Sequence, residues 1–88
     1  MDFNWRKLDA LLTLALNDVK DPLARDLECV VEISKKLSDE QKTELEEFGI
    51  TDFSTRFKVA TFSAEDLKQL SNLDGVRRIE KSIKHHTC

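Results

Sequence analysis

The sequence is poor in the residue types that mark several large classes of protein. Of its 88 residues only two are glycine and one is proline, and none is tyrosine. This composition lies outside the collagenous, low-complexity and disordered classes, because 40% of the residues are hydrophobic and can form a core. We therefore expect a folded domain, and at this length its core must be small.

Long apolar runs are also missing. No stretch approaches the roughly 18 to 20 apolar residues that cross a bilayer, and the first residues, Met1 to Trp5, lack the basic-then-apolar order of a signal peptide. The sequence therefore predicts a cytoplasmic protein without a membrane partner. Cys29 and Cys88 fit a reducing compartment as two free thiols, which we favour over a disulfide between an apolar run and the chain end.

Motifs of catalysis and of cofactor binding are absent as well. Gly49 and Gly75 stand alone, so there is no glycine-rich phosphate loop. The segment His85 to Cys88 contains metal-ligand types, but a structural zinc site needs four ligands fixed by the fold. No recognisable motif places a nucleophile or carboxylate beside these histidines. The sequence predicts a protein that is not an enzyme and holds no metal and no cofactor.

The formal net charge of −3 disfavours nucleic acid as a partner, because general affinity for nucleic acid comes from Lys and Arg that neutralise phosphates. An alternative is a basic sheet face with Arg56 and Lys58, on which Phe53 and Phe57 would stack on bases. We disfavour it because a small core needs its phenylalanines. The expected partner is therefore another protein.

What is present begins with an apolar stripe near the N-terminus. Its spacing predicts a helix that begins near Asn4 and ends near Asp21, before Pro22. Such a wide stripe must cover either the rest of the domain or another chain. If it covers another chain, Leu8, Leu12 and Leu16 are the candidate face of a homodimer. The stripe consists of Leu8, Leu11, Leu12, Ala15, Leu16 and Val19.

From Leu27 onward the period of the apolar residues changes to two, which predicts a strand with Leu27, Cys29, Val31 and Ile33 on one face. Ser38 to Gln41 then has the form of a capping box, so we expect a helix that ends at a left-handed glycine, Gly49.

Two further strands and one helix are expected in the second half. Residues 50–62 are rich in β-branched and aromatic types and predict either one bent strand or a hairpin. Ser63 to Asp66 resembles a second capping box, followed by a helix closed by Gly75 in the same way as the first. The last strand is expected from Val76 to Lys84.

A capped helix followed by glycine and a strand therefore occurs twice. The repeat predicts an α+β fold, a ferredoxin-like split β-α-β sandwich with an antiparallel sheet that carries two helices on one face. We expect a single domain over residues 1–88. It comprises an N-terminal helical extension over 1–26, the ferredoxin-like core over 27–84 and a flexible tail over 85–88.

The residues from Ser63 to Glu80 read SAEDLKQLSNLDGVRRIE. Here the predicted helix ends in Leu-x-Gly-Val and leads into a strand with an apolar and then an acidic residue. This order of residues resembles that in the propeptides of subtilisin-type serine proteases and in the related stand-alone inhibitors. The matching positions here are Leu73, Gly75, Val76, Ile79 and Glu80. The first strand and helix, up to Gly49, also fit this family.

The resemblance implies a protein-binding module that docks on a subtilisin-type serine protease by its sheet, with the C-terminal tail entering the active-site cleft. The implied contact residues of the last strand and tail are Ile79, Lys81, Ile83, Lys84, His85, His86, Thr87 and Cys88.

Three features depart from the family. The segment 50–62 is short for the family's two-strand hairpin, Cys88 and His85 stand where such proteases favour apolar side chains, and the helix over 5–19 has no counterpart. The tail and the helix support a second hypothesis, an adaptor or homo-oligomerisation domain of the same fold with no protease partner.

Overall fold

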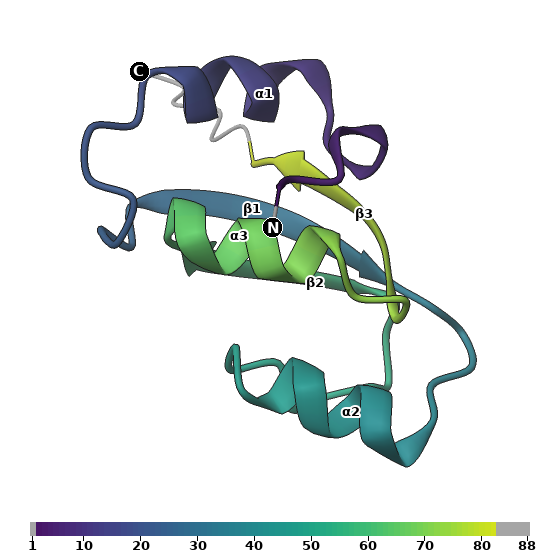
Figure 1. Ribbon diagram of the computed structural model, residues 1–88. Coiled ribbons are helices and arrows are strands. Elements are labelled where there is room, and N and C mark those ends of the chain that lie inside the picture. The colour runs from purple at the N-terminus through teal and green to yellow at the C-terminus, as the bar shows by residue number, and fades with distance from the viewer. Residues whose placement is uncertain (1, 83–88) are drawn as a thin grey trace, which may run out of the picture.

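The computed structural model describes residues 2–82 (Figure 1). As predicted, the chain is α+β: a three-stranded antiparallel sheet is combined with three α-helices. In chain order the elements are η1, a 3-10 helix (Trp5–Lys7), α1 (Ala10–Asn17), β1 (Leu27–Ile33), α2 (Asp39–Glu46), β2 (Phe57–Phe62), α3 (Ala64–Ser71) and β3 (Val76–Lys81).

The sheet has the order β2-β1-β3, and β1 is antiparallel to both neighbours. β2 and β3 therefore run parallel to each other on either side of β1, and α3 connects them. Leu27 lies opposite Phe62, and Val31 lies opposite Ile79. These pairs place large apolar side chains of all three strands on one face.

That face, which we call the helix-covered face, carries the core. Burial alternates along β1 as predicted, with Leu27, Cys29, Val31 and Ile33 all buried. Side chains from all three helices join the same buried cluster: Leu12 and Leu16 from α1, Leu45 from α2, and Leu67 and Leu70 from α3. Figure 1 shows α3 lying across β1 and β2, with α1 and α2 on either side of it.

The opposite face, which we call the open face, is formed by the alternate residues of the same strands. Glu28, Val30 and Glu32 of β1 are only partly buried. Their neighbours in the register are Thr61, Val59 and Phe57 of β2, and Glu80 and Arg78 of β3.

Both predicted capping boxes are present. Ser38 Oγ accepts from the Gln41 N–H and the Gln41 side chain accepts from the Ser38 N–H. Ser63 and Asp66 do the same at the start of α3. Gly49 has the predicted left-handed conformation, with φ of 85°.

Gly75 corrects a prediction, because it does not adopt a positive φ. It leaves room for Leu37 instead: a Cβ at this position would lie 2.9 Å from Leu37 Cδ2, so the end of the Leu37 side chain would have to shift. A real Cβ almost never approaches another atom so closely. The glycine therefore permits the close contact between the α3–β3 turn and the segment that leads into α2.

Asn4 is the N-cap of the 3-10 turn η1 only, and α1 begins at Ala10, so the predicted continuous helix from Asn4 is wrong. Leu8 instead forms a parallel bridge with Ile79, and the Asp9 N–H donates to the Ile79 carbonyl at 3.2 Å. Asp9 is the N-cap, and its Oδ1 accepts from the Leu12 N–H at 3.0 Å. The stripe that suggested an earlier start includes Leu8, which is buried beside the sheet rather than in a helix.

The segment 50–62 forms one strand only in its second half. β2 begins at Phe57, and residues 51–56 contain no strand. Within this connection the Ser54 N–H and hydroxyl both donate to Asp52 Oδ1, at 2.9 and 2.6 Å. A hairpin is therefore not formed, and the described part of the sheet has three strands.

Candidate functional site

The open face of the sheet carries the exposed apolar side chains of the strands. Phe57 is 54% exposed and Val59 is 63% exposed, and both belong to β2. Val30 lies directly beside Val59 in the register. These three residues form an apolar patch in a sheet whose other face is packed with leucine, valine and isoleucine. We take this patch as the candidate binding site.

Charged side chains surround the patch. Arg78 Nε lies 3.0 Å from Glu80 Oε1 on the same face, and the Arg56 guanidinium lies 5.6 Å from the centre of the Phe57 ring. Glu32 is placed between Phe57 and Arg78 by the register. An apolar centre with a polar rim is the usual anatomy of a protein-binding surface.

β2 is also an edge strand of the sheet. The Arg56 carbonyl accepts from the Ile33 N–H at 2.7 Å, so even-numbered residues of this strand direct their backbone groups at β1. Phe57, Val59 and Thr61 therefore direct theirs outward. Within residues 2–82, these outward groups make one hydrogen bond inside the chain, in which Thr55 Oγ1 donates to the Phe57 carbonyl at 3.3 Å.

The other edge, along β3, is closed by the chain itself. Besides the bond from the Asp9 N–H to the Ile79 carbonyl, Asp9 Oδ1 accepts from the Lys81 N–H at 3.2 Å. One carboxylate oxygen thus serves both the start of α1 and the edge of β3.

Two residues of the predicted contact surface lie on β3. Ile79 is fully buried in the core, so its side chain is not available to a partner. Lys81 is half-buried, and its Nζ donates to the carbonyls of Glu28 at 3.4 Å and Ser82 at 3.3 Å. The other predicted contact residues, Ile83, Lys84, His85, His86, Thr87 and Cys88, lie outside the described residues.

The leucines proposed for a homodimer face lie in the core of their own chain. Leu12 is fully buried, and Leu8 and Leu16 are each 9% exposed. These three therefore pack in cis, and the large apolar residues that α1 exposes are Leu11 and Leu14.

Two further bonds anchor the N-terminal segment to the C-terminal end of α3. The Asn4 N–H donates to Ser71 Oγ at 3.0 Å. Lys7 Nζ donates to the Leu73 carbonyl at 2.8 Å. Burial lowers the pKa of the Lys7 ammonium, and the nearby Asp74 opposes that shift.

Cys29 is unsuited to act as a nucleophile. Burial raises the pKa of its thiol to about 12, and Lys81 opposes this only in part. Because the thiolate is the reactive form, a thiol with such a pKa stays protonated and inert at neutral pH. Its Sγ lies 3.7 Å from the Leu27 carbonyl, to which it donates.

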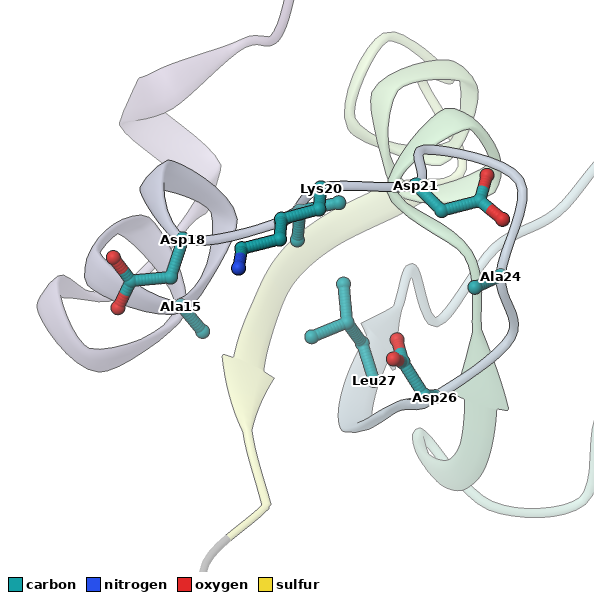
Figure 2. A pocket seen from close by; sticks show the side chains of 8 residues that line it. Ala15, Asp18, Lys20, Asp21, Ala24, Asp26 and Leu27 are labelled. Atoms are coloured by element: carbon teal, nitrogen blue, oxygen red, sulfur yellow. The ribbon is translucent and has the colours of Figure 1, made fainter.

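A hollow of about 400 Å³ lies between the end of α1 and the start of β1 (Figure 2). Three carboxylates line it, but Figure 2 shows those of Asp18 and Asp21 turned to opposite sides, so they do not converge on one point. Lys20 adds a positive charge between them. Over residues 2–82, no group of three or more His, Cys, Asp or Glu residues is arranged to hold a metal ion.

In the same range, each helix is too short or too polar to cross a membrane. Comparison of the chain with protein-family models, with curated proteins and with solved structures found no match in any of the three.

Proposed function

We propose that this chain is a non-catalytic protein-binding domain of ferredoxin-like fold, which docks on a partner through the open face of its sheet. The observation that carries the proposal is the apolar patch on the open face, in which Phe57 and Val59 are exposed and the partly buried Val30 lies beside Val59. A contiguous apolar patch with a polar rim marks an interaction site more often than a catalytic one.

The ferredoxin-like assignment is supported by the topology. Two parallel strands, β2 and β3, enclose an antiparallel strand and are joined by a helix, which is one split β-α-β unit. A full ferredoxin-like chain has the order β-α-β-β-α-β. Here residues 51–56 take the chain position before β2 without forming a strand.

The family resemblance supports a subtilisin-type serine protease as the partner. The resemblance implies docking by the sheet, and the open face is the part of the sheet without a helix over it in the described chain. The implied second contact is the tail beyond Ile83. The first candidate function is therefore an inhibitor-like or propeptide-like module.

A titration of a subtilisin-type protease with the intact protein tests this function. We expect inhibition that weakens about tenfold or more in Val59→Glu, because a charge replaces the centre of an apolar contact. Leu14→Glu is the matched control: Leu14 is 62% exposed, nearly the same as Val59, but lies on α1. A chain that ends at Ile83 reports on the tail. Digestion of the intact protein without inhibition would remove the protease from consideration.

A second candidate function is an adaptor or homo-oligomerisation domain with no protease partner. It is favoured by the outward backbone groups of β2, since an unpaired strand edge is a site at which another chain adds a strand. The closed edge along β3 makes β2 the edge at which such addition would occur.

A further inference from the structure

We infer that two copies of this chain pair through the outer edges of their β2 strands, antiparallel, around a two-fold axis at Val59. The inference rests on the second candidate function. It uses the edge of the sheet and covers the open face only beside Val59, so the protease proposal can hold or fail separately from it.

The backbone geometry defines the register. Phe57, Val59 and Thr61 direct their N–H and C=O groups outward, because Arg56 bonds to Ile33 of β1 and the direction alternates along a strand. With the axis at Val59, each Val59 faces its copy, and each Phe57 faces Thr61 of the second copy. Each of these pairs exchanges two hydrogen bonds, so every outward group of the strand finds a partner.

The side chains fit the same register. On the open face, Val59 meets Val59 of the second copy, and Val30 stands beside each of them. The result is a row of four valines across the middle of a six-stranded sheet. Val59 is 63% exposed in the single chain, so the pairing removes apolar area from water at the axis.

Charge favours this register over the registers with the axis at Lys58 or at Phe57. With the axis at Val59, Lys58 faces Ala60 of the second copy, and Lys58 is already paired with Asp52 at 3.4 Å. An axis at Lys58 sets two lysines opposite each other, and an axis at Phe57 sets Lys58 opposite Arg56. Like charges directly opposite each other destabilise a pair of strands.

An axis shifted the other way, to Ala60, fails for a different reason. It would set Phe57 opposite Ser63 of the second copy. The Ser63 N–H already donates to Asp66 Oδ2 at 3.2 Å in the capping box of α3. The Val59 register therefore pairs all three outward residues without a like-charge contact and without disturbing a helix cap.

The closed edge limits the assembly to two chains. The combined sheet would run β3-β1-β2 in one copy and β2-β1-β3 in the other, so both of its edges are β3. Asp9 occupies that edge at Ile79 and Lys81. An isologous pairing of this kind closes on itself, and the product is a dimer rather than a filament.

The test is sedimentation equilibrium of the intact protein at concentrations up to roughly 1 mM, where association with a Kd of that order is visible. We expect the wild-type mass to rise to that of two chains. Val59→Pro removes an outward N–H that β1 does not use, so the strand can keep its pairing with β1 while losing the dimer bond. It should raise the dimer Kd about tenfold or more.

Circular dichroism checks that the proline variant remains folded. If it does not, Val59→Lys replaces it, since two lysines would then face each other at the axis. Leu14→Lys is the matched control and should keep the wild-type Kd. A wild-type chain that stays monomeric, or a dimer that persists in the folded Val59 variants, would overturn the inference. If the wild-type chain is monomeric but inhibits a subtilisin-type protease, only the dimer inference is overturned. If it forms the dimer but does not inhibit the protease, only the first candidate function is overturned.

Discussion

The helix-covered face and the open face are built from the same three strands, yet they differ in almost every contact. Val31 and Val30 are adjacent in β1 and identical in type. Val31 is fully buried beneath the helices, whereas Val30 is only partly buried on the open face. Residue type therefore does not decide which of the two is in the core. The position of the helices decides it, and the helices are placed by their caps and connections.

The comparison also separates two kinds of apolar residue. Those on the helix-covered face contribute to the free energy of unfolding, because burying them removes apolar area from water within one chain. Those on the open face contribute little to folding and remain available to a partner. The following predictions test that division.

The largest effect is expected from paired alanine substitutions in β1. Val31→Ala leaves a cavity in the core and should lower the free energy of unfolding by about 2 kcal/mol. Val30→Ala should lower it by less than about 1 kcal/mol, since the side chain is partly in water already. Urea denaturation measures both. Equal losses at the two positions would mean that the open face is covered in solution.

A smaller effect is expected at the carboxylate that holds α1 beside the sheet. Asp9→Ala removes the N-cap of α1 and the acceptor for the Lys81 N–H, and should lower the free energy of unfolding by about 1 to 2 kcal/mol. Asp18→Ala, at the exposed C-terminal end of the same helix, is the control and should have little effect. If both variants have wild-type stability, α1 does not depend on its cap to stay on the helix-covered face.

The smallest effect concerns pH and Cys29, studied with Cys88→Ser so that one thiol remains. The folded-state pKa of Cys29 is raised to about 12 from the ordinary 9.0. Above pH 9 the unfolded chain loses this proton while the folded chain keeps it, so stability falls as pH rises towards 12. At pH 9 the free energy of unfolding is already lower by about 0.4 kcal/mol than at pH 7.

Denaturation at pH 7 and pH 9 measures this loss, with Cys29→Ala as the reference that lacks the thiol. The difference between the two proteins should grow further at pH 10. An identical pH dependence in both would show that Cys29 is reached by water on the helix-covered face.

Local patterns in the sequence predicted the parts of the fold that local physics determines. The alternation of Leu27, Cys29, Val31 and Ile33 marked β1 and its buried face. The serine caps at Ser38 and Ser63 marked the starts of two helices, because a capping box is complete within four residues.

The parts that were missed depend on contacts distant in the chain. Leu8 belongs to the helical stripe by spacing, but it pairs with Ile79 and so cannot begin a helix. Phe57 and Val59 stand two residues apart in β2 and so share one face of the strand, yet nothing in their neighbourhood shows that the helices cover the other face. Ile79, an expected contact residue of the last strand, is buried in the core because its side chain faces the helices, which its own neighbours in the sequence do not show.

The tight approach at Gly75 has a consequence for how sequences of this fold can vary. Because a methyl group at position 75 would meet the end of the Leu37 side chain, the two side chains compete for the same space. A homologous chain with alanine at position 75 would need residue 37 either to turn its side chain away or to be shorter. A joint change of this kind is a signature that an alignment can detect without any structure.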